Sequence, residues 1–212
     1  MSDSAPFGRG RLRRLVGLDR TGRKPRPTRR GEPLHPWTLP NLVGYVRLGA
    51  LPLFLYLAFD SGDGRSAAAA TVFWLIAAGD YLDGFLARVT GQYSRMGALL
   101  DPLVDRLTVL SGAIVCWHFD LLPHWALALL ALRELVMLGL AEIGLRHGVD
   151  IEVNWPGRLS VFPIMGGIFF AMVFAGWVPE ALLIVGLGLA ILATVLYAQA
   201  GLRAVRDAAP AR

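Results

Sequence analysis

Four aspartates stand out because they interrupt segments that are otherwise apolar. They form two pairs along the chain: Asp80, Asp83, Asp101 and Asp105. Residues three or four apart share one face of a helix, so each pair is expected on a single face. If residues 89–96 form a turn between antiparallel helices, the two outermost acids reach the same depth, roughly 12 Å from that turn. The spacing therefore predicts one pocket lined by four carboxylates.

A divalent metal ion is the occupant that suits such a pocket. Charged side chains inside a membrane are costly and usually functional. Clustered carboxylates are hard oxygen ligands, which Mg²⁺, Ca²⁺ and Mn²⁺ prefer. A purely structural role would require nearby cations to neutralise all four acids, and the adjacent sequence holds too few basic residues for that. The acids are therefore predicted to bind metal.

The composition places these acids in a membrane protein. The chain has 212 residues, of which 55% are hydrophobic, and its mean hydropathy is +0.51. That is too apolar for an ordinary soluble domain and long enough for about six spans of ~20 residues. The single cysteine, Cys116, allows no intrachain disulfide. The predicted fold class is an all-α integral membrane protein.

Basic residues concentrate at the start of the chain. Ten of the 21 Lys and Arg residues fall within residues 1–30. Residues 1–33 are predicted to be a disordered, basic, cytoplasmic arm. Beside a membrane domain, anionic lipid head groups are a better partner for it than nucleic acid, and a solvated tail is the simpler alternative. Residues 34–202 would form the membrane catalytic domain, and 203–212 a cytoplasmic tail.

The hydrophobic runs predict six transmembrane helices. Their expected ranges are about 41–59, 67–88, 97–118, 125–145, 159–177 and 181–201. Cytoplasmic loops carry the excess of Lys and Arg, and placing both termini in the cytoplasm puts nearly all of these residues on that side. This orientation puts the 89–96 turn, and with it the acid pocket, at the cytoplasmic face of the cell membrane.

Small residues accompany the acids on the same helix faces. Gly84 and Ala87 share the face of the first acid pair, and Gly97 shares that of the second. Small residues let helix backbones approach each other or leave room for a flat ligand. Arg88 ends the second span, where it could extend to the interface or bind a phosphate.

These residues together resemble the signature of the CDP-alcohol phosphotransferase family. The matching run reads Asp80-x-x-Asp83-Gly84-x-x-Ala87-Arg88, then eight residues, then Gly97-x-x-x-Asp101-x-x-x-Asp105. Asn41 and Arg47 resemble the Pro-Asn…Arg pattern of the family's first span. Gly44 departs from that pattern, because a threonine is expected there.

The resemblance implies a reaction and a role for each residue. The acceptor hydroxyl would attack the β-phosphorus of CDP-diacylglycerol and expel CMP, with two Mg²⁺ (or Mn²⁺) ions bridging the diphosphate. By the same resemblance, Asp80, Asp83 and Asp101 would bind metal, and Asp105 would contact the second ion and accept the hydroxyl proton. The CDP part would be held by Gly84, Ala87, Arg88, Ser94, Gly97 and Asn41. The family resemblance also implies a homodimer.

The acceptor alcohol is less well defined by the sequence. Arg133-Glu134 resembles a pair found in phosphatidylglycerophosphate synthases, which favours glycerol 3-phosphate. Arg158 begins the fifth span, where that subfamily carries further cations that are missing here. Glycerol 3-phosphate, which yields phosphatidylglycerophosphate, is the leading prediction; phosphatidylglycerol, which yields cardiolipin, and inositol 1-phosphate stay open as alternatives. Arg47, Arg133 and Arg158 are the candidate acceptor-binding residues.

Two other classes of protein compete with an enzyme. A cation transporter could use intramembrane acids, but its polar path should continue to the far side, whereas the third span becomes apolar beyond Asp105. A lipid-binding scaffold could rely on the basic arm, but it leaves the four acids unexplained. The sequence therefore favours a phosphatidyltransferase of phospholipid biosynthesis.

Overall fold

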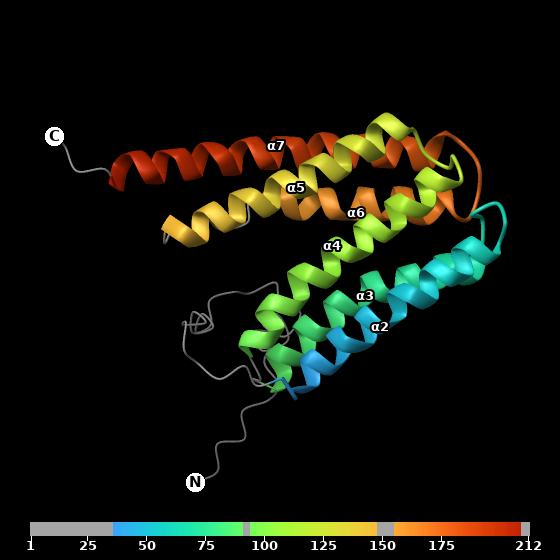
Figure 1. Cartoon of the computed structure of the whole chain (residues 1–212), viewed down its shortest axis with the longest axis horizontal. Helices are drawn as coiled ribbons and strands as arrows, with labels where there is room; N and C mark the ends of the chain where they lie inside the picture. Colours follow the sequence, from blue (N-terminus) through green and yellow to red (C-terminus); the bar gives the residue numbers. More distant parts are fainter. Residues whose placement is uncertain (1–35, 91–93, 148–154, 209–212) are drawn as a thin grey trace, which may run out of the picture. The chain divides into compact units, whose positions relative to one another are not determined.

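The computed structural model describes residues 36–90, 94–147 and 155–208, and these residues form six α-helices and no strand (Figure 1). The basic arm predicted for residues 1–33 lies outside the described residues. The helices are α2 (Leu39–Asp60), α3 (Ala67–Thr90), α4 (Arg95–His118), α5 (His124–His147), α6 (Trp155–Ala171) and α7 (Trp177–Ala208). The all-helical class is confirmed for this part of the chain.

The helices divide between two compact units. The first, here called the acid-bearing unit, joins the described residues up to Leu51 with Leu75–Thr108. The second unit joins Pro52–Trp74 with the described residues from Val109 onward. The first therefore takes the beginning of α2, the end of α3 and the beginning of α4. The remaining parts of these helices, with α5, α6 and α7, belong to the second unit.

Hydroxyl side chains begin three of the helices. The amide of Asn41 donates to Thr38 Oγ1 (3.4 Å), and the amide of Ala69 donates to Ser66 Oγ (3.2 Å). Ser94 accepts from the Gly97 amide in the same way at 2.9 Å. Such caps satisfy amide groups that have no partner inside the helix. α2 begins at Leu39, before the predicted Asn41, because proline is tolerated in a first helical turn.

The connection between α6 and α7 differs from its prediction. The sequence predicts a link at residues 178–180, but α6 ends at Ala171 and α7 already begins at Trp177. Pro179 lies in the first turn, where its missing N–H costs little, and Glu180 there complements the positive end of the helix dipole. α7 then continues to Ala208, into the segment predicted as a tail.

Glycines bring α6 and α7 close together. A Cβ added at Gly167 would lie 2.9 Å from the Leu183 amide nitrogen, and one at Gly186 would lie 2.8 Å from the Ile164 nitrogen. Backbone atoms cannot move aside as side-chain ends can, so both positions require glycine. Gly186 therefore packs against another helix of the same chain.

Three of the helices are long and apolar enough to cross a bilayer. They are Leu39–Asp60, Ala67–Ala87 within α3, and Trp177–Gln199 within α7; Gly157–Ala171 is a shorter apolar helix. Large apolar side chains also face outward, including Phe162 at 76% and Tyr56 at 65% exposure. Helices that are apolar on their outer faces suit a lipid environment. Three of the six predicted spans thus have this support.

Candidate active site

Arg47, a residue of α2, lies at the centre of the candidate site and contacts both helices that carry the acids. Its side chain is only 3% exposed. Nη1 donates to Asp83 Oδ2 at 2.8 Å, and Nη2 donates to Asp105 Oδ1 at 2.6 Å. Asp80 Oδ1 lies 3.5 Å from the same Nη1. Three of the four predicted acids, from α3 and α4, therefore gather around one cation.

A backbone contact and a glycine hold the Arg47 side chain in this position. Arg47 Nε donates to the Ile76 carbonyl at 2.9 Å, which ties α2 to α3. At Gly79, a Cβ would lie 2.7 Å from Arg47 Cδ and 2.8 Å from its Cγ. Gly79 thus provides the space through which the arginine passes, and Figure 1 shows α2 and α3 side by side.

The acids differ in how much of each side chain is exposed. Asp83 is 4% exposed, whereas Asp80 and Asp105 are 52% and 45% exposed. Asp101 is partly exposed. The cluster therefore has a buried end at Asp83 and an accessible end at Asp80 and Asp105, where a ligand can approach.

Three predicted CDP-binding residues meet where α2 and α4 begin. Ser94 Oγ donates to Asn41 Oδ1 at 2.9 Å while it accepts from the Gly97 amide at 2.9 Å. Asn41 Nδ2 donates to the Pro36 carbonyl at 3.0 Å, and Asn41 is 2% exposed. A Cβ at Gly97 would lie 2.8 Å from Asn41 Oδ1. In this structure the three residues join α2 to α4.

Gly44, the departure from the family pattern, has a packing role. A Cβ at this position would lie 2.5 Å from Cδ2 of Leu100, a residue of α4 that is 6% exposed. Because Gly44 has no side chain, Leu100 can pack directly against the α2 backbone. Gly44 supports the approach of the two helices.

The remaining predicted residues fall in different places. Gly84 and Ala87 are partly exposed on α3, and the side chain of Arg88 lies outside the described residues. Arg133 and Arg158 belong to the second unit. Arg133 donates to Glu134 Oε1 at 2.5 Å and to Thr194 Oγ1 at 3.3 Å, whereas Arg158 is exposed at the start of α6.

The four acids provide the type of ligand that a divalent ion requires. Their carboxylates are the hard oxygen ligands that Mg²⁺ takes, and three of them turn toward a positive charge. Across the described ranges, no three His, Cys, Asp or Glu side chains gather closely enough to hold one ion. The ligand type fits, and the carboxylates are arranged around the Arg47 guanidinium.

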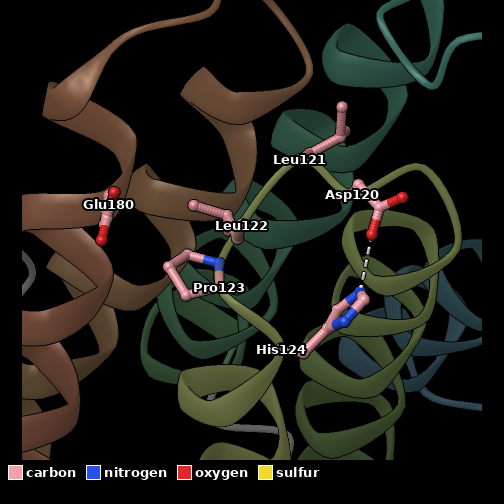
Figure 2. Close-up of a pocket in the computed structure, with 6 residues that line it drawn as sticks. All are labelled: Asp120, Leu121, Leu122, Pro123, His124 and Glu180. Carbon is pink, nitrogen blue, oxygen red and sulfur yellow. Dashed lines mark ion pairs between the residues drawn. The ribbon is translucent and has the colours of Figure 1, made fainter.

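A cavity of about 370 Å³ lies elsewhere, at the α4–α5 loop (Figure 2). Its lining residues are Asp120, Leu121, Leu122, Pro123, His124 and Glu180. His124 pairs with Asp120 at 2.9 Å and stacks on Trp117 with 4.3 Å between ring centroids. Asp120 has φ +53°, a conformation typical of a tight turn. These contacts stabilise the conformation of the α4–α5 loop. The residues that line the cavity include none from the family signature.

Sequence reasoning missed Gly79 and did not anticipate the contacts between Arg47 and the acids. The acceptor-binding role predicted for Arg47 stays a prediction; in the structure this side chain contacts three of the acids and the Ile76 carbonyl. Its position inside an apolar span was the available signal, because a buried arginine requires anionic partners. For Gly79 the signal was a glycine immediately before Asp80 on the same helix.

Comparison with known proteins identifies the family. The model of the CDP-alcohol phosphatidyltransferase domain matches residues 37–196. The chain belongs to the CDP-alcohol phosphatidyltransferase family. The signature resemblance is therefore confirmed, and the matched range includes every helix that contributes to the candidate site. As a member of this family the protein is a transferase of phospholipid biosynthesis.

Its relatives within the family carry two acceptor names. It is 35% identical to "Cardiolipin synthase (CMP-forming)" of Streptomyces coelicolor, over 77% of this chain and 79% of that protein. It is 37% identical to "Probable phosphatidylglycerophosphate synthase" of Mycobacterium tuberculosis, over 58% of this chain and 60% of that one. A Bacillus subtilis CDP-diacylglycerol–glycerol-3-phosphate 3-phosphatidyltransferase is 28% identical over 59% of this chain and 72% of its own length.

Proposed function

We propose that this phosphatidyltransferase acts at the cluster of Asp80, Asp83, Asp101 and Asp105, with CDP-diacylglycerol as the phosphatidyl donor. The observation that carries the proposal is the gathering of three signature acids from two helices around one buried cation. The exposed side of the cluster, at Asp80 and Asp105, is where the diphosphate would approach.

The reaction would be a displacement at phosphorus. The acceptor hydroxyl oxygen forms a bond to the β-phosphorus, the bond from that phosphorus to the CMP oxygen breaks, and CMP leaves with the electron pair. Asp105 takes the hydroxyl proton, help that typically contributes about 10²–10⁴-fold. Two bound Mg²⁺ or Mn²⁺ ions would neutralise the diphosphate and the leaving group. Asp80, Asp83, Asp101 and Asp105 would hold them.

For the acceptor we favour phosphatidylglycerol, with cardiolipin as the product. The Streptomyces coelicolor relative that bears this name matches over 79% of its length. The start of α6 offers Arg158 without the further cations expected for glycerol 3-phosphate, a phosphomonoester. Glycerol 3-phosphate is the second candidate, favoured by the Arg133–Glu134 pair and by the Mycobacterium tuberculosis relative.

The membrane setting is part of the proposal. Six spans with both termini in the cytoplasm would put the acids at the cytoplasmic face of the cell membrane, where a lipid donor and a soluble or lipid acceptor can both enter. The apolar outer faces of the helices support this setting. The homodimer that the family resemblance implies stays a prediction.

The test uses purified full-length protein in detergent with Mg²⁺ and labelled CDP-diacylglycerol. Phosphatidylglycerol, glycerol 3-phosphate and inositol 1-phosphate are offered in separate reactions, and CMP and the lipid product are measured. We expect Mg²⁺-dependent CMP release with cardiolipin formed from phosphatidylglycerol. CMP release with glycerol 3-phosphate alone would show that the proposed reaction is right and that glycerol 3-phosphate, not phosphatidylglycerol, is the acceptor. No release with any acceptor would overturn the proposed function.

A further inference from the structure

Arg47 is a charged group of the acid-bearing unit whose contacts the reaction does not yet explain. The Arg47 side chain is 3% exposed, and its guanidinium donates to one carboxylate from each of two helices and lies 3.5 Å from a third carboxylate. Two of these acids, Asp83 and Asp105, are also proposed ligands of the divalent ions. A carboxylate oxygen that accepts a short charge-assisted hydrogen bond has less capacity left for a metal ion.

We propose that Arg47 is a built-in counter-cation that competes with the divalent ion for the carboxylates of Asp83 and Asp105. Without the ion, the guanidinium compensates the buried Asp83 and keeps Asp105 occupied. When the ion binds, Arg47 releases at least one of these contacts, and Asp105 becomes free to accept the hydroxyl proton. This inference rests on the proposed function, because it requires the acid cluster to be the ion site.

The charge balance of the cluster supports competition. Arg47 supplies one positive charge, whereas the three acids in contact with it would supply three negative charges. Such a cluster still attracts a cation, and a second positive charge a few ångströms away weakens that attraction. Removing the arginine charge should therefore tighten ion binding.

Gly79 offers a way to move Arg47 without removing its charge. A Cβ at this position would lie 2.7 Å from Arg47 Cδ, so the arginine chain must shift. Alanine is a better helix former than glycine, so Gly79→Ala carries no intrinsic penalty for α3. The variant displaces the guanidinium from the acids while every charged residue is retained.

The experiment measures Mn²⁺ affinity directly, by electron paramagnetic resonance of the free ion, on the full-length protein without substrate. We expect Arg47→Gln to bind Mn²⁺ about tenfold more tightly than the wild type, because one neighbouring positive charge is gone. Arg47→Lys should stay close to the wild type. Arg133→Gln removes a partly exposed arginine from the second unit and should leave the Mn²⁺ affinity unchanged.

Gly79→Ala guards against a misfolded Arg47→Gln variant, and it should also bind Mn²⁺ more tightly. Circular dichroism and size-exclusion chromatography establish that each variant is folded. Folded Arg47→Gln and Gly79→Ala variants with unchanged or weaker Mn²⁺ affinity would overturn the competition and make Arg47 a residue that positions the ligands. A folded wild type that binds Mn²⁺ but releases no CMP would instead contradict the proposed function. Absence of Mn²⁺ binding in all variants would overturn both.

Discussion

Each of the two compact units contains an arginine paired with acid, and the two arginines differ in their partners. In the acid-bearing unit, Arg47 is in contact with three carboxylates from two other helices. In the second unit, Arg133 pairs with the neighbouring Glu134 and donates to Thr194. In the first cluster, three carboxylates surround one guanidinium. In the second pair, one carboxylate meets one guanidinium.

The units also differ in what brings their helices together. Around Arg47 the close approaches at Gly79 and Gly97 involve a polar side chain, whereas Gly167 and Gly186 bring backbone against backbone. A side-chain end can rotate away from an added group, whereas a packed backbone cannot. The contacts at Gly167 and Gly186 should therefore tolerate an added Cβ less well than those at Gly79 and Gly97.

The largest expected effect comes from removing the proposed base. Asp105→Asn should lower CMP release by about 10²–10⁴-fold, because the amide cannot accept the hydroxyl proton. Glu134→Gln is the matched change in the second unit and should cause a much smaller loss, since its amide oxygen still accepts from Arg133. Initial rates with Mg²⁺ and labelled donor measure both. Equal losses in the two variants would remove the distinction between the units.

Arginine removal tests the charge balance through stability. Arg47→Gln should destabilise the ion-free protein by about 3 kcal/mol, because it leaves buried Asp83 without its cation. Arg133→Gln should cost about 1 kcal/mol, since Arg133 is 16% exposed and the glutamine can still donate to its neighbours. Thermal unfolding in detergent with a chelator provides the comparison. A larger loss of stability for Arg133→Gln than for Arg47→Gln would contradict this expectation.

The rigid packing of α6 against α7 can be tested with two glycines of the same helix. Gly186→Ala should destabilise the protein by about 1–3 kcal/mol through overpacking against the Ile164 backbone. A Cβ added at Gly188 would meet no other described part of the chain within 4 Å, so Gly188→Ala should be neutral or stabilise α7 by up to about 1 kcal/mol. The thermal midpoints of both variants decide. A tolerated Gly186→Ala would show that this contact can relax.

The smallest effect is expected where α2 and α4 begin. Ser94→Ala removes the acceptor of the Gly97 amide and the contact with Asn41, at a cost of about 1 kcal/mol. If Ser94 also holds the CDP part, the KM for CDP-diacylglycerol should rise as well. Ser66→Ala, which removes the cap of α3, is the control for stability alone. An unchanged KM would limit Ser94 to its capping role.

Much of this architecture follows from local sequence. Apolar runs of about the right length predicted helices near all six observed ranges, and the caps at Ser66 and Ser94 define where two of them begin. Two helices begin earlier than predicted, at Leu39 and at Trp177, and each includes a proline in its first turn, Pro40 or Pro179. The ring is tolerated in a first turn, although it is disfavoured in a helix interior.

The sequence by itself determined the acids, their shared helix faces and the family, because helical periodicity depends only on spacing along one segment. Tertiary structure decided which cation those acids meet. Arg47 lies 36 residues from Asp83 and 58 from Asp105, and only the packing of α2 against α3 and α4 brings them together. Likewise, Gly79 gains its role from a side chain that another helix supplies. Contacts between helices depend on the backbone approach that the whole unit allows, and no local pattern records it.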